Sequence, residues 1–260
     1  MPIHGHVRPD YVLPFFGHRL YLVPLIASLF CLAALAFPVM LAVQSDRLTS
    51  VVFVDDVIAC GVEACVWSQL TNWASLLLAV SFYMRCKVVR DFLVPDHCGL
   101  LLQRNPGLND VSLRVGLVAA SSLFIAANFG EGQVYSVHVI GVWLATISAI
   151  VYWWLQVRWL KAQIDRTHRN IQTNMFFMTL LGTIMMRASL WSLSGDIFDD
   201  RNASECRLSL NADPDDSPYI LMAAIGQWMT VFGLALLPLT FVNDFRIVSQ
   251  KLEEQAKWMY

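Results

Sequence analysis

Residues 111–129 read VSLRVGLVAASSLFIAANF, and residues 134–157 read VYSVHVIGVWLATISAIVYWWLQV; only Gly130-Glu131-Gly132-Gln133 separates them. Each stretch is about as long as a helix that crosses ~30 Å of hydrocarbon at 1.5 Å per residue. Lipid accepts only helices or closed barrels, and both stretches are continuously apolar rather than alternating. A connection this short predicts that the two helices form a tight antiparallel hairpin.

Four further apolar segments accompany this hairpin, at residues 20–43, 65–84, 175–194 and 218–241. The 260 residues are 57% apolar and 15% charged, whereas soluble domains carry about a quarter charged residues. The first segment exceeds the ~7–15-residue apolar core of a signal peptide, so we interpret it as a retained signal anchor. The sequence predicts an all-α, polytopic membrane bundle of six transmembrane helices over residues 20–244.

The basic residues predict the orientation of this bundle. Three arginines, Arg47, Arg201 and Arg207, lie on the side opposite the termini. Lys and Arg accumulate in cytoplasmic loops, so residues 1–19 and 245–260 should both be cytosolic. For the second of these segments a short amphipathic helix and disorder remain alternatives. Thirteen basic residues lie on the side of the termini: Arg8, Arg19, Arg85, Lys87, Arg90, Arg104, Arg158, Lys161, Arg166, Arg169, Arg246, Lys251 and Lys257.

Two covalent modifications are predicted on the luminal side. Asn202-Ala203-Ser204 is a glycosylation sequon in the predicted loop between the fifth and sixth segments. Cys60, Cys65 and Cys206 also fall on this side, where oxidation is permitted. Three cysteines cannot all pair. We favour Cys65 with Cys206, which would join the two large loops, over Cys60 with Cys65.

Two polar residues inside apolar segments have both structural and functional interpretations. Arg187 lies in the fifth segment, where an unpaired charge costs about 3 kcal/mol or more. It is either a lipid-headgroup site or, as we favour, a structural hydrogen-bond donor to Gln227, Asn72 or Asn128. His138 begins the fourth segment and is either a pH sensor or a packed, hydrogen-bonded side chain.

The sequence supplies no pattern for catalysis, metal or nucleic acid. There is no Gly-x-Ser-x-Gly elbow and no paired acid and base at a membrane surface. The cysteines and histidines lack zinc spacing, so we expect neither a metal nor a cofactor. No basic stripe interleaves with aromatic residues, which argues against nucleic acid. The one partner predicted directly is the lipid bilayer.

Short motifs recur along the chain in an order that resembles the damage-regulated autophagy modulator (DRAM) family of six-span membrane proteins. The sequence departs from the family at Gly130, where Gln is usual, and at Gln227, where an acidic residue is usual. The matched stretches are Cys65-Val66-Trp67 leading to Asn72, Gly116-Leu117-Val118, Ala127-Asn128-Phe129, His138-Val139-x-Gly141, Tyr152-x-x-x-Gln156, and Trp228 followed by Asp244-Phe245. We carry over Asn128, Phe129, His138, Gly141, Trp228 and Asp244 as structural signature residues, not as catalysts.

This resemblance implies a non-enzymatic lysosomal or other endomembrane protein that modulates autophagy. The wider superfamily implies two alternatives: a Golgi protein in lipid remodelling of GPI-anchored proteins, or a plasma-membrane adaptor for a phosphoinositide kinase. Residues 96–101 also fit an acidic dileucine sorting signal, with Asp96 as the acid and Leu100 and Leu101 as the leucine pair. Such a signal would direct the protein to endosomes and lysosomes.

Overall fold

A computed structural model describes residues 19–45, 53–58, 61–90, 107–130, 134–160, 166–192 and 217–257. Within these ranges the secondary structure is helical. The elements are α1 (Leu22–Gln44), α2 (Val54–Ile58), α3 (Gly61–Val88), α5 (Gly107–Asn128), α6 (Tyr135–Trp154), the π-helix η3 (Leu155–Leu160), α7 (Arg166–Ser192), α8 (Ser217–Leu236) and α9 (Leu239–Lys257).

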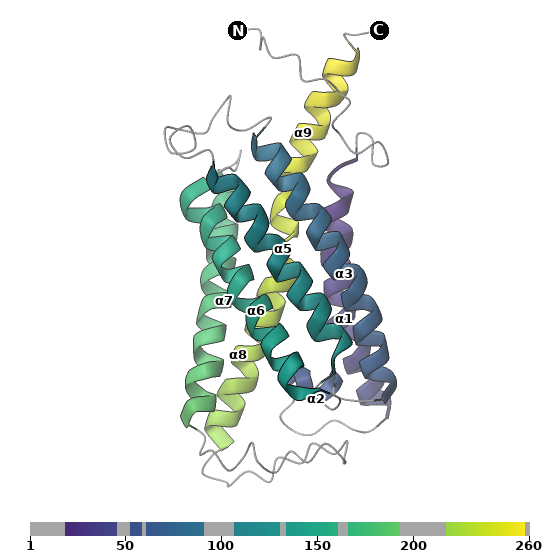
Figure 1. Cartoon of the computed structure of the whole chain (residues 1–260), viewed down its shortest axis with the longest axis vertical. Coiled ribbons are helices and arrows are strands. Elements are labelled where there is room, and N and C mark those ends of the chain that lie inside the picture. The colour runs from purple at the N-terminus through teal and green to yellow at the C-terminus, as the bar shows by residue number, and fades with distance from the viewer. Residues whose placement is uncertain are drawn as a thin grey trace.

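The long helices run up and down in one bundle, and the described chain begins and ends at the same end of it (Figure 1). Five candidate membrane spans occur in the described residues: Leu22–Gln44, Gly107–Asn128, Tyr135–Val157, Arg169–Ser192 and Pro218–Gln250. The sixth long helix, α3, is less apolar because Gln69, Thr71 and Asn72 lie within it. It nevertheless runs the length of the bundle beside α1 and α5 (Figure 1), so the six-helix prediction is confirmed.

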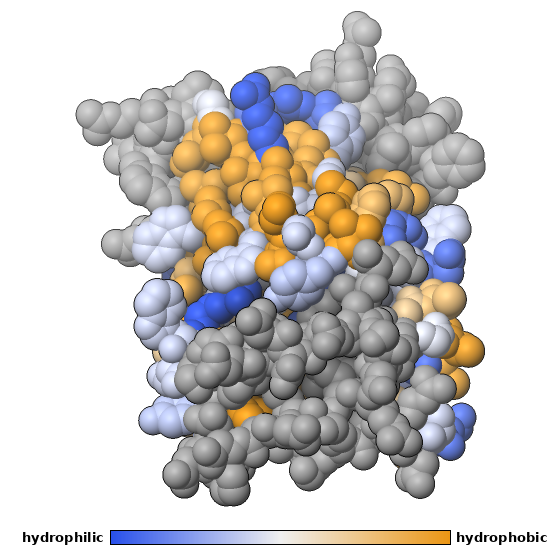
Figure 2. Space-filling view, turned by 60° about the horizontal axis from the view of Figure 1, so that its bottom comes forward, coloured by the Kyte–Doolittle hydropathy of each residue, from blue (hydrophilic) through white to orange (hydrophobic). Residues whose placement is uncertain are grey.

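Apolar side chains cover much of the outside of the bundle. Ile140 on α6 is 65% exposed, and Leu29, Phe124 and Leu181 are also exposed on three other helices. Figure 2 shows orange side chains over the helices, bordered by pale side chains toward the end at which α2 lies. A surface of this kind is costly in water and favourable in lipid, which is why the bundle needs a bilayer around it.

Two groups of helices make up the bundle. Helices α1, α3, α5 and α6 pack side by side, and α7 packs mainly against α8. The α7–α8 pair is tight because both helices present glycine at the contact: a Cβ on Gly226 would lie 2.6 Å from the Met186 backbone nitrogen. A hydrogen bond of 3.2 Å between the Thr183 and Thr230 hydroxyls joins the same two helices. The pair meets the other four helices less closely.

Two expected boundaries differ from the structure. The fifth segment is predicted to start at residue 175, but α7 starts at Arg166, and its early turns include the polar Gln172, which is buried and bonded to Thr240. The boundary expected at residue 244 falls inside α9, which continues from the end of the sixth segment to Lys257. Phe245 and Val248 are buried, so the first half of the expected tail belongs to the core.

Candidate functional site

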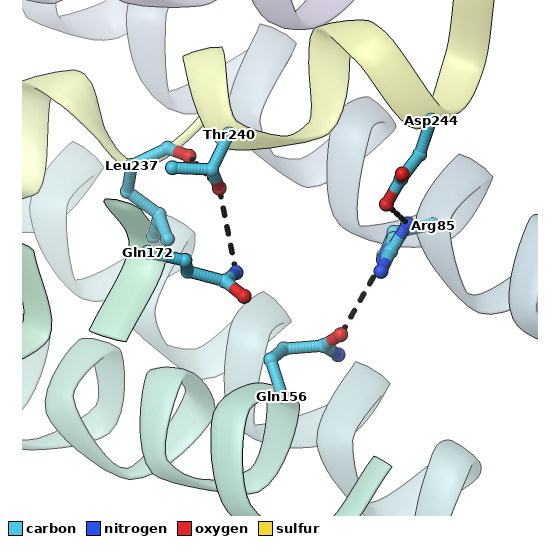
Figure 3. Close-up of polar contacts among 6 residues, drawn as sticks. All are labelled: Arg85, Gln156, Gln172, Leu237, Thr240 and Asp244. Carbon is cyan, nitrogen blue, oxygen red and sulfur yellow. Dashed lines mark hydrogen bonds and ion pairs between the residues drawn. The ribbon is translucent and has the colours of Figure 1, made fainter. Parts of the chain in front are cut away.

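A buried ion pair joins α3 to α9 near the end of the bundle at which the described chain begins and ends. Arg85 Nη1 donates to Asp244 Oδ2 at 2.7 Å, and the two side chains are 1% and 0% exposed (Figure 3). The Arg85 guanidinium also lies over the Phe241 ring, 5.1 Å from its centroid. In a low-dielectric interior each charge needs its partner, since removal of either leaves a buried, uncompensated ion.

Further hydrogen bonds extend this ion pair to two more elements. Arg85 Nε donates to Gln156 Oε1 at 3.4 Å, and Gln156 Nε2 donates to Ser112 Oγ at 2.9 Å. Gln156 lies in η3, and the wider backbone of a π-helix is often found at functional sites. The network therefore connects α3, α5, η3 and α9.

A second polar contact, also drawn in Figure 3, joins α7 to the same region. Gln172 Nε2 donates to the Thr240 hydroxyl at 3.4 Å, and that hydroxyl donates to the Leu237 carbonyl at 2.7 Å. Leu237 lies in the turn between α8 and α9. The contact therefore joins α7 to α9, the continuation of the sixth span, at the end of the bundle that carries the ion pair.

Sequence reasoning identified only part of this network. Asp244 and Gln156 were marked by the family resemblance, whereas Arg85 was counted as an ordinary basic flank. Because Arg85 is buried, it no longer counts among the thirteen basic residues on the side of the termini. The twelve that remain still outnumber the three on the opposite side. The available signal was Asp244 itself, because a carboxylate at the end of an apolar helix requires a cation nearby.

The predicted hairpin between residues 111–129 and 134–157 is confirmed, and three signature residues, Phe129, His138 and Gly141, close it. His138 Nδ1 lies 3.0 Å from the Ala126 carbonyl oxygen and 2.9 Å from that of Phe129, at the end of α5. Both partners are acceptors, so Nδ1 carries the proton. A Cβ on Gly141 would lie 3.1 Å from the Ala126 nitrogen, which lets α6 approach α5 closely.

The other signature residues serve similar packing roles. Asn128 and Asn72 exchange two amide hydrogen bonds, at 2.7 and 3.1 Å, and so tie α5 to α3. Trp228 packs against Phe232 on its own helix, with ring centroids 5.5 Å apart, and against the apolar cluster formed by α1, α2 and α8. Both residues therefore pack between helices of the bundle, and the signature role that the resemblance implied stays a prediction.

A cavity of about 250 Å³ lies between the α7–α8 pair and the other helices. Its wall is mostly apolar, with Leu35, Leu78, Ala145 and Leu234 among the lining residues. The short helix α2 covers one end of it. Gln227 holds this helix in place, since its Oε1 accepts from the Val54 backbone N–H at 2.8 Å and its Nε2 donates to Asp55 Oδ2 at 2.7 Å.

Arg187 has a different partner from those expected. It lies five residues before the end of α7. Its guanidinium stacks on Trp143 of α6, 3.5 Å from the ring centroid, and not on Gln227, Asn72 or Asn128. Within the described residues its Nε has no hydrogen-bond partner, and the side chain lines the cavity.

Several predicted sites lie outside the described residues: Asn202, Cys60, Cys206 and the sorting residues Asp96, Leu100 and Leu101. Cys65 is exposed on the second turn of α3. Its pairing with Cys206 or Cys60 stays a prediction. The described part of the chain contains no cluster of three or more His, Cys, Asp or Glu side chains able to hold a metal ion.

Comparison with known proteins identifies the family of this chain and several of its relatives. The family described as "Frag1/DRAM/Sfk1/Cwh43P N-terminal domain" matches residues 19–248. The chain is 23% identical over 244 residues to DNA damage-regulated autophagy modulator protein 2 of Bos taurus, covering 92% of this chain and 88% of the relative. It is 27% identical over 193 residues to DNA damage-regulated autophagy modulator protein 1 of Homo sapiens, covering 74% and 76%. No solved structure matches it.

Proposed function

This chain belongs to the Frag1/DRAM/Sfk1/Cwh43P family, and from that premise we propose that it is a multi-pass endomembrane protein that modulates autophagy without an enzymatic activity of its own. The observation that carries the proposal is the match of most of the chain to relatives named as autophagy modulators. The match covers the six-helix bundle and not an isolated motif.

The polar groups of the bundle support a role exercised through binding rather than through catalysis. Asp244 is neutralised by Arg85, His138 Nδ1 holds the α5–α6 hairpin, and Gln227 holds α2. Each of these groups has a partner that fixes the fold, and none is paired as nucleophile and base. A protein of this design acts through what its surfaces and cavity bind.

We place both termini in the cytosol and the loop of residues 193–216 in the lumen of a lysosome or related organelle. The basic asymmetry of the sequence supports this orientation. The dileucine pattern at residues 96–101 supports the proposed lysosomal location, because in this orientation it would be exposed to cytosolic sorting adaptors.

Deletion of the protein in cells tests the proposal. The expected result is a changed level of lipidated autophagosome marker, with GPI-anchored proteins retained normally at the cell surface. Re-expression of the intact chain should restore the marker. Release of GPI-anchored proteins with an unchanged marker would instead support the Golgi remodelling alternative and overturn the proposal.

A further inference from the structure

The cavity between the α7–α8 pair and α6 has the shape and the polar groups of a binding site. We propose that it holds a membrane lipid with one aliphatic chain and an uncharged head that carries hydroxyl groups. This inference does not depend on the proposed role in autophagy, since it rests only on the geometry of the bundle.

The shape of the cavity favours a chain. Along α6 its lining residues extend from Tyr135 to Ala149, which is about 21 Å of helix at 1.5 Å per residue. Toward the far end the wall is formed by Phe82, Ala149 and Leu237, which offer no polar partner to a ligand. Binding pockets are commonly preformed and apolar, with a few polar groups gathered at one part. In a membrane, bilayer lipid surrounds these helices and can supply an aliphatic ligand to the cavity.

The polar groups gather at the α2 end of the same cavity. Three lining side chains have a buried polar atom without a hydrogen-bond partner within the described residues: Thr71 on α3 and, nearer to the helix ends at which α2 lies, His138 and Arg187. Because His138 Nδ1 faces two carbonyl oxygens, Nε2 is the ring nitrogen left for a ligand; it is buried and has no hydrogen-bond partner within the described residues. Arg187 Nε is a donor that is also buried and has no hydrogen-bond partner within the described residues. A hydroxyl-bearing head satisfies both, because one hydroxyl accepts from arginine and a hydroxyl hydrogen donates to histidine.

The charges at this end favour a neutral head over an anionic one. Arg187 and Asp55 both line the cavity and carry opposite charges. A carboxylate or phosphate head would bring a net negative charge into this balanced site and would leave His138 Nε2 without a donor. Monoacylglycerols have the matching chemistry.

Photolabelling of the full-length protein tests the proposal. The protein in phosphatidylcholine nanodiscs is exposed to a monoacylglycerol that carries a diazirine in its chain, and in parallel to a fatty acid with the same chain and diazirine. We expect the monoacylglycerol to label residues of α6, α7 and α8 that line the cavity. An excess of unlabelled mono-oleoylglycerol should abolish this labelling.

Matched variants separate the cavity from the outer surface. Ala145→Phe places a ring inside the cavity, whereas Leu144→Phe places the same ring on the lipid-facing side of the same helix, where Leu144 is 45% exposed. The first variant should lose competitor-sensitive labelling and the second should keep it. Arg187→Met should weaken labelling about tenfold, whereas Arg169→Met, at the other end of α7, should not change it.

Three results would overturn the proposal: labelling spread evenly over lipid-facing residues, labelling of the wild-type protein that the competitor does not reduce, and stronger cavity labelling by the fatty acid. The competition is measured on the wild-type protein, so it tests whether the cavity binds the lipid even when a variant fails to fold.

Discussion

Arg85 and Asp244 meet at 2.7 Å although 159 positions separate them along the chain. The contact joins the end of the second span to the helix that continues the sixth, and it is shielded from solvent on all sides. Through Gln156 the same arginine reaches η3, so one buried cation joins three elements at the end of the bundle at which the described chain begins and ends. Polar contacts therefore join the helices at this end of the bundle, and the contacts of Gln227 with α2 do so at the other.

Removal of either charge should destabilise the bundle strongly. Asp244→Ala leaves Arg85 buried without its partner, for an expected cost of about 3–5 kcal/mol in the free energy of unfolding. The double variant Arg85→Met with Asp244→Leu should recover much of this loss, since it leaves no buried charge. Thermal unfolding in detergent measures both, with Glu254→Ala on the exposed face of α9 as control. Equal stability of Asp244→Ala and the control would contradict the assigned role.

The α7–α8 contact should be intolerant of even a single methyl group. Gly226→Ala brings a Cβ to 2.6 Å from the Met186 nitrogen and 2.7 Å from the Gly182 carbonyl oxygen, both backbone atoms that cannot move aside cheaply. We expect a loss of about 1–3 kcal/mol from overpacking. Gly107→Ala is the matched control, because a Cβ there meets nothing within 4 Å. Equal melting temperatures for the two variants would show that the helices do not pack as described.

His138 should matter for the hairpin even without any ligand. His138→Phe keeps a ring of similar size but removes the donor to the Ala126 and Phe129 carbonyls. Leaving these groups unsatisfied should cost about 1–3 kcal/mol. Hydrogen exchange at the end of α5 measures the effect, with Val137→Phe, the neighbouring substitution, as comparison. Unchanged hydrogen exchange in His138→Phe would show that the histidine does not stabilise the hairpin.

Asn202 should carry a glycan when the protein is made in cells. Its loop lies on the predicted luminal side, where glycosylation takes place, so digestion with a glycosidase should increase gel mobility. The variant Asn202→Gln should migrate like the digested protein and should not respond to the enzyme. A wild-type protein whose mobility digestion does not change would refute the modification.

Much of the fold follows from local composition, which is why the sequence predicts it well. Six apolar stretches and one four-residue connection suffice for the helices and the α5–α6 hairpin, because lipid leaves the backbone few alternatives. The resemblance added the residues that close this hairpin, including His138 and Gly141.

The rest depends on tertiary contacts that local patterns do not encode. Nothing around Arg85 distinguishes it from a flanking arginine until α9 brings Asp244 against it. Nothing around Gln172 indicates that it is buried and bonded to Thr240. The cavity lies where α7 packs less closely on α6 than on α8, and the closeness of helix packing depends on both helices rather than on one segment.

The central claim is a six-span bundle with both ends in the cytosol, and protease protection in sealed organelles tests it most directly. Three forms of the protein carry an epitope at the N-terminus, at the C-terminus or within the loop of residues 193–216. Protease added from outside should remove both terminal epitopes and spare the loop epitope until detergent opens the membrane. Terminal epitopes that differ in their protection, or a loop epitope cleaved before detergent is added, would contradict the account.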